Sequence, residues 1–319
     1  MTSSLSRWVD RGPTKGRLLA SVDYRVPLLR NRVEPSKACR WRRNWSYDWM
    51  DAYYINLDRQ PQRRAHIEAT LTFASLTAYR IPGVEGLNVP PHLRSYFFNA
   101  AGIQPSRLSA GEIGCYASHM LAWQRIAEGN KPYALVVEDD AVFTYKIKEQ
   151  VLAALAEAPS DWDIIHLCTP GGRAVKPVGA QLVRYSRVPM NGTGYVVSQS
   201  GAQKLLTPMV RAYPVDTDLR RPWLFRLNIY GIVPAPVEAL PHFGSDIPVR
   251  SRRRRGLRPN PLHTPQGLLW NIQKLGFAWW LRCLCHNAGR RAVRDLSPWR
   301  VLRKAWLGAL SVKLTFERS

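Results

Sequence analysis

The chain has 319 residues, 45% of them hydrophobic and 10% aromatic, which is enough for a packed core and excludes a disordered protein. The net charge is +23, and the excess of Lys and Arg over Asp and Glu lies mainly at the two ends. The counts are 11 against 4 over residues 1–50, 19 against 17 over 51–249, and 16 against 2 over 250–319. We therefore expect a basic irregular arm, a near-neutral globular domain and a basic, Trp-rich tail.

The cysteines and the apolar segments bear on the cellular compartment. Five cysteines are scattered along the chain without the spacing of a zinc site, which favours a reducing compartment. The first 25 residues contain no apolar core of signal-peptide length, and no stretch reaches about 18 uninterrupted apolar residues. A cytoplasmic protein is the expectation.

Helical and strand patterns alternate through the middle of the chain. Strands are predicted near 52–58, 78–86, 133–140, 161–168 and 195–198, and helices near 59–76, 109–129, 147–158 and 199–209. Ser109 is a candidate helix cap, with Glu112 three residues later. Alternation of this kind predicts an α/β, Rossmann-like fold with a mostly parallel sheet flanked by helices.

Three consecutive carboxylates, Glu138, Asp139 and Asp140, follow the apolar run 133–137. Such a run is typical of a strand buried on both faces, and adjacent carboxylates at its end repel one another. One interpretation is a solvated loop, and the other is a site for a divalent cation such as Mg²⁺ or Mn²⁺, which prefers hard oxygen ligands. No G-x-G-x-x-G follows the first strand and no P-loop motif occurs, so neither a dinucleotide site nor a P-loop is predicted.

Four segments in order resemble glycosyltransferase family 25, the lipooligosaccharide glycosyltransferases that also include collagen galactosyltransferase domains. They read "YYINLDRQPQRR", "SAGEIGCYASHMLAWQRI", "ALVVEDDAVF" with "DWDIIHL" downstream, and "GTGYVVSQSGAQKLL". The resemblance covers about residues 52–245. It implies a GT-A fold, a nucleotide-sugar donor, most often UDP-galactose, a divalent metal, and inversion at the anomeric carbon.

The resemblance also implies roles for particular residues. Asp140 and Glu138 would be ligands of Mn²⁺ or Mg²⁺, with a Glu138 side chain turned into the sheet as the alternative. Asp139 would assist the metal ligand or bind the donor ribose. Asn56 and Arg63, or the neighbouring Arg64, would lie near the uracil and the phosphates.

Two further residues, Glu112 and His119, would belong to the donor site. The alternative readings are a helix-capping glutamate and a histidine satisfied within the core.

An inverting transfer needs a group that takes the proton of the acceptor hydroxyl. The segment "YPVDTDLRRPW" supplies Asp216, which is the candidate base, and Asp218. His242 is a further candidate, either as base or as a late metal ligand.

The predicted function is transfer of a hexose from a UDP-sugar to a glycan or lipid-linked saccharide in lipooligosaccharide or lipopolysaccharide biosynthesis. The tail holds Trp and Leu at helical spacing with Lys274 and Arg282, which predicts an amphipathic helix on an anionic membrane surface, on the cytosolic face. An ordinary packed helical subdomain is the alternative for the tail. Metal-dependent nucleotide-sugar hydrolysis is a rival function. Binding of nucleic acid or another anionic surface through the arginine-rich ends is a second rival, although the near-neutral middle domain leads us to expect no nucleic acid.

Overall fold

The computed structural model describes residues 50–169, 175–240 and 264–295, all within one compact unit of residues 43–319. The expected arm, residues 1–50, lies outside the described residues except for its last position. The strands are β1 (Asp51–Asn56), β2 (Thr77–Pro82), β3 (Tyr133–Glu138), β4 (Ala141–Phe143), β5 (Ile164–His166), β6 (Val175–Pro177), β7 (Leu182–Tyr185), β8 (Gly194–Ser198), β9 (Ile229–Ile232) and β10 (Val237–Ala239). The helices are α1 (Pro61–Phe73), a 3₁₀ helix η1 (Pro91–Tyr96), α2 (Ala110–Glu128), α3 (Ile147–Glu157), α4 (Gln199–Leu205), α5 (Val215–Leu219), α6 (Pro222–Phe225), α8 (Pro265–Leu275) and α9 (Phe277–Asp295).

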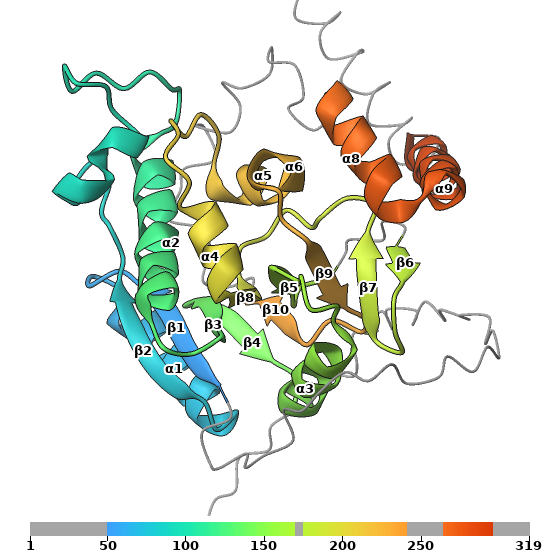
Figure 1. Cartoon of the computed structure of the whole chain (residues 1–319). Helices are drawn as coiled ribbons and strands as arrows, with labels where there is room; N and C mark the ends of the chain where they lie inside the picture. The colour runs from blue at the N-terminus through green and yellow to red at the C-terminus, as the bar shows by residue number, and fades with distance from the viewer. Residues whose placement is uncertain (1–49, 170–174, 241–263, 296–319) are drawn as a thin grey trace, which may run out of the picture. The chain divides into compact units, whose positions relative to one another are not determined.

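The central sheet is mixed, and its order is β2-β1-β3-β8-β5-β9-β7-β6 (Figure 1). β2, β1 and β3 are parallel, and so are β5 and β9. β8 runs antiparallel to both of its neighbours, β3 and β5, and β7 runs antiparallel to β9 and β6. The α/β class is confirmed, and the parallel part of the sheet is the part that ends in the acidic triplet.

Two layers of apolar side chains, one on each face of the sheet, form the core. β3 shows the alternation: Ala134 and Val136 join the cluster that contains α2 and α4, whereas Leu135 and Val137 join the cluster that contains α1 and α3. A strand covered on both faces is expected to be apolar at successive positions, as "ALVV" is. The polar residues that follow β3 therefore lie at the carboxyl end of the strand, between the helical layers that cover the two faces of the sheet.

The longest helix of the core, α2, begins as its sequence predicts. The Ser109 hydroxyl accepts the backbone N–H of Glu112 at 3.3 Å, and the Glu112 carboxylate accepts the backbone N–H of Ser109 at 2.9 Å. This capping box satisfies two backbone donors at the helix start. Along α2 one face is fully buried, so the helix is held rigidly beside the end of β3.

The tail contains two helices where the sequence suggested one amphipathic stretch. α8 ends at Gly276, whose φ of +79° suits glycine, and α9 follows directly. Leu275 and Cys283 are buried, and Lys176 Nζ donates to the Leu275 carbonyl at 2.8 Å, so one face of this pair packs on the sheet edge at β6 and β7. None of the described helices is long and apolar enough to cross a membrane.

Candidate active site

A cavity of about 630 Å³ lies at the carboxyl ends of β1 and β3. Its walls come from the end of β1 and the start of α1, the end of β3, the first turns of α2, the loop 190–193 before β8, and the start of α5. In α/β sheets the carboxyl edge of the strands is where ligands bind. Every site residue predicted from the sequence lines this cavity, apart from the alternatives Arg64, Asp218 and His242.

Asp139 is held from two sides at the edge of the sheet. Asn56 Nδ2 donates to its Oδ2 at 2.7 Å, and Arg63 Nε donates to its Oδ1 at 2.7 Å. Burial raises the pKa of Asp139, while Asn56 and Arg63 act in the opposite direction. Both carboxylate oxygens are thus engaged by the first strand and first helix, which fixes the orientation of the triplet.

Asp140 is the carboxylate with spare bonding capacity. Its Oδ2 lies 3.5 Å from Arg63 Nη2, whereas its Oδ1 is buried and has no hydrogen-bond partner among the described residues. Burial, and then the nearby Glu138, raise the pKa of Asp140 to about 7. A buried carboxylate oxygen without a partner is costly unless something binds it. The hard oxygen donors here fit Mg²⁺ or Mn²⁺.

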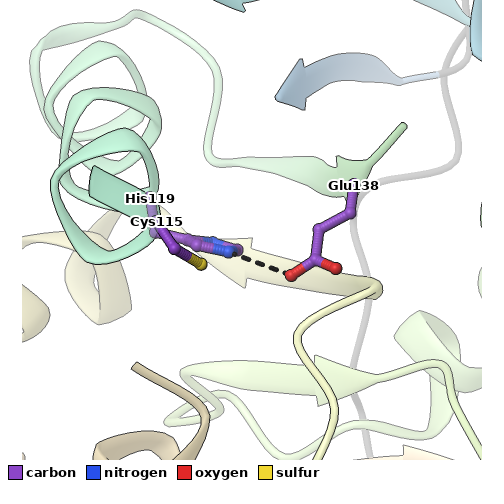
Figure 2. Close-up of side chains that lie close together, drawn as sticks. All are labelled: Cys115, His119 and Glu138. Carbon is purple, nitrogen blue, oxygen red and sulfur yellow. Dashed lines mark hydrogen bonds and ion pairs between the residues drawn. The ribbon is translucent and has the colours of Figure 1, made fainter. Parts of the chain in front are cut away.

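The Glu138 side chain faces helix α2 (Figure 2). Its Oε1 lies 3.4 Å from His119 Nε2, and Cys115 lies one helical turn before His119 on the same face. Burial, followed by the charges of Glu138, Asp216 and Glu112, raises the pKa of the Cys115 thiol well above its usual value. One carboxylate of the triplet thus has a different set of neighbours from the other two.

The two carboxylates of α5 have different surroundings. Asp216 lines the cavity and accepts a hydrogen bond from the Thr217 hydroxyl at 3.3 Å, and burial raises its pKa. Asp218 is buried outside the cavity, where it accepts from Tyr116 Oη and from Arg221 Nη1, each at 3.1 Å. Of this pair, only Asp216 is placed where a substrate can meet it.

The remaining predicted residues fall into three situations. Glu112 caps α2 and also lines the cavity, so its position is compatible with both hypotheses, a helix-capping role and a role in the donor site. Arg63 points into the cavity, while Arg64 forms an exposed pair with Glu68 on α1. His242 lies outside the described residues.

The loop before β8 leads into the fourth family-like segment, but the sequence analysis assigned no individual site residue to it. His166 Nε2 donates to the Asn191 carbonyl at 2.8 Å, and its Nδ1 accepts the Cys168 backbone N–H at 3.3 Å. Burial lowers the pKa of His166 to about 4, so it is neutral. The neutral His166 ring thus holds the loop at Asn191, next to Gly192, which lines the cavity. The glycines of "NGTG" were the available signal.

Comparisons with known proteins bear on the same region. The model of glycosyltransferase family 25 (LPS biosynthesis protein) matches residues 50–219. Procollagen galactosyltransferase 1-A of Xenopus laevis is 35% identical over 185 residues, which is 52% of this chain and 30% of that protein. Procollagen galactosyltransferase 1 of Danio rerio is 29% identical over 185 residues, again 52% and 30%.

A third relative is described as inactive. It is the probable inactive glycosyltransferase 25 family member 3 of Rattus norvegicus, which is 26% identical over 188 residues, 52% of this chain and 32% of that protein. The chain spans less than a third of the length of each of these relatives. The family model, in contrast, covers more than half of this chain and includes β1, α2, β3 and α5. The chain belongs to glycosyltransferase family 25.

Proposed function

We propose that this protein is an inverting glycosyltransferase that transfers a hexose, with galactose from UDP-galactose as the first choice, to a saccharide or lipid-linked saccharide. The observation that carries the proposal is the gathering of Asp139, Asp140, Arg63 and Asp216 around one cavity at the end of β3. The names of the relatives support a galactosyl donor, and the family description supports an acceptor in lipopolysaccharide synthesis. The strand-end site in an α/β fold supports a GT-A arrangement.

The donor would bind with its diphosphate beside the acidic triplet. Asp140 is the proposed cation ligand because its Oδ1 is buried and has no hydrogen-bond partner in the described part of the chain. A Mn²⁺ or Mg²⁺ there would neutralise the charge of the departing diphosphate. One or two carboxylates together with substrate phosphates are the usual ligand set for such ions. Asp139, fixed by Asn56 and Arg63, is proposed to orient the donor.

Asp216 is proposed to be the general base. It would accept the proton of the acceptor hydroxyl while that oxygen attacks the anomeric carbon, as the bond to the diphosphate breaks on the opposite side. Its raised pKa suits a group that must take up a proton. Its position in the wall of the same cavity as the triplet supports an acceptor bound beside the donor.

The experiment is a panel of UDP- and GDP-sugars with and without Mn²⁺, scored by stabilisation against thermal unfolding and by sugar transfer to saccharide acceptors. We expect metal-dependent stabilisation by UDP-galactose and transfer only when acceptor is present. Full activity with excess chelator would contradict the proposal. Donor hydrolysis without any transfer would favour the hydrolase instead.

We also propose peripheral attachment to the cytosolic face of a membrane through α8 and α9. These two helices expose five large apolar residues, Leu268, Leu269, Phe277, Leu281 and Leu284. Lys274 and Arg282 lie in the same helices, and a mixture of apolar and basic groups suits an anionic interface. Attachment would hold the enzyme near a lipid-linked acceptor.

A further inference from the structure

The side chains of Cys115, His119 and Glu138 lie close together in the wall of the cavity (Figure 2). One potential ligand atom from each, a sulfur, a nitrogen and an oxygen, all lie within 4.8 Å of one another. We propose that these three residues bind a borderline divalent cation, Zn²⁺ in the first place, at a site distinct from the hard-cation site of Asp140.

The types of ligand argue for zinc rather than for Mn²⁺ or Mg²⁺. Thiolate and imidazole are preferred by Zn²⁺ and related transition metals, whereas oxygen-only sets suit Mg²⁺ and Mn²⁺. Cys115 and His119 are four residues apart on α2, so they share one helix face, and Glu138 ends the adjacent strand β3. Two rigid elements thus supply all three ligands.

The distances leave room for an ion. The contact between His119 Nε2 and Glu138 Oε1, at 3.4 Å, is longer than an ordinary N–H···O hydrogen bond. A tetrahedral ion with bonds of about 2.0–2.3 Å holds its ligand atoms roughly 3.5 Å apart, so closing the site requires shifts of about 1 Å. Rotation about side-chain bonds supplies shifts of that size, and the thiol proton leaves to solvent as the sulfur binds.

Tyr195 and Trp123 orient the His119 ring through hydrogen bonds, as neighbouring residues commonly orient the histidine ligands of zinc. His119 Nδ1 lies 2.9 Å from the Tyr195 hydroxyl, and Trp123 Nε1 donates to that same hydroxyl at 2.8 Å. When Nδ1–H donates to Tyr195, the lone pair of Nε2 points toward Glu138 and Cys115. Such a contact to the second ring nitrogen is the usual arrangement around a metal-bound histidine.

The fourth coordination position faces the cavity. Gly192 lies opposite the cluster, and a methyl group added to it would come within 2.9 Å of Glu138 Oε1 and 3.5 Å of His119 Nε2. Because Gly192 has no side chain, the space in front of the two ligands stays open to the cavity. Three protein ligands with an open fourth position allow a bound ion to take water or an oxygen of a ligand in the cavity.

The test is titration of the purified 319-residue chain with Co²⁺, which reports a thiolate ligand through a charge-transfer band in the near ultraviolet. We expect the band to saturate at one equivalent and to disappear when Zn²⁺ is added. Cys115→Ser should abolish the band. It should also weaken Zn²⁺ binding by at least about 100-fold, because losing a residue that only supports a ligand already costs up to about that much, and Cys115 is a ligand itself. Thermal unfolding and circular dichroism would be used to check that the variant is folded.

Two controls separate this site from others. Cys283→Ser combined with Cys285→Ser removes the thiols of α9 and should leave the band unchanged. Asp140→Asn should also retain the band, because the hard-cation site uses different ligands. A band that survives in Cys115→Ser, or that is lost in the α9 double variant, would overturn the proposal. No sugar is present, so failure of the transferase proposal would leave this result intact.

Discussion

Arg63 and Asp139 are 76 residues apart in sequence, yet Arg63 Nε donates to Asp139 Oδ1 at 2.7 Å, and both side chains are about nine-tenths buried. This pair ties α1 to the end of β3. Arg63→Met should lower the free energy of unfolding by about 3–5 kcal/mol, because it leaves a buried carboxylate without its cation. Urea unfolding measures the loss.

The neighbouring arginine provides a matched control for Arg63. Arg64 makes an exposed i,i+4 pair with Glu68, and exposed pairs contribute little. Arg64→Met should therefore leave stability nearly unchanged. If Arg63→Met and Arg64→Met lowered the free energy of unfolding equally, the ion pair of Arg63 with Asp139 would not be an important source of stability.

Asp140→Asn is expected to abolish metal-dependent transfer while the fold is retained. Burial raises the pKa of Asp140 to about 7, above the value near 4 of an unfolded chain, so the folded state favours the neutral form. The stability tied to that neutral form is present at pH 4 and is lost as the pH rises through 7. Without metal, the amide variant should thus be at least as stable as the parent at pH 8. Undiminished activity in this variant would exclude Asp140 as the metal ligand.

Asp216→Asn should lower kcat by about 10²-fold or more and leave donor affinity nearly unchanged, as expected when a general base is lost. Steady-state kinetics and donor titration separate the two quantities. Asp218→Asn is the matched control, since its side chain lies outside the cavity. If kcat fell only in the Asp218 variant, with its fold intact, the base assignment would move there.

Asp218 should make folding stability depend on pH. Burial raises its pKa to about 6, so its contribution to stability is complete below about pH 4 and is lost as the pH rises through 6. Between pH 4 and 7.5 the parent should lose on the order of 3 kcal/mol relative to Asp218→Asn. Urea unfolding of both proteins at the two pH values measures this difference. Parallel pH profiles would show that the carboxyl does not titrate in this way.

Membrane attachment is tested best by point changes, because removing α8 would uncover Leu275 and the apolar surface beneath it. Leu269→Gln combined with Phe277→Gln should weaken sedimentation with anionic vesicles at least about 10-fold, since apolar area no longer enters the interface. High salt should weaken binding by the parent protein as well. Phe73→Gln, which changes an exposed phenylalanine on α1, is the control and should have no effect. Equal binding by all three proteins would refute the attachment surface.

The sequence predicted the elements that are long or strongly patterned, and the acidic edge of β3 that follows from them. It did not determine which of two nearby residues faces the cavity. Asp216 and Asp218 are two positions apart on a five-residue helix, so they point in different directions, and only the packing of α5 decides which one meets the cavity. The same holds for Arg63 and Arg64 on α1.

Short strands and side-chain directions were beyond sequence reasoning for a physical reason. β6 and β10 have three residues each and β7 and β9 have four, too few to show a period of two. The sequence left open whether Glu138 is a ligand beside Asp140 or turns into the sheet. The direction of this strand-end side chain depends on α2 and Gly192, which approach from distant parts of the chain.

The antiparallel strand β8 has a consequence for how the chain folds. Residues 194–198 pair with β3 on one side and with β5 on the other, across about 60 residues of intervening sequence on the β3 side. During synthesis, the second edge of β3 therefore stays unpaired until residue 198 has left the ribosome. An apolar strand with an open edge is prone to associate with other chains, and pairing over such separations is slow. The nascent protein should accordingly depend on chaperones until β8 is inserted.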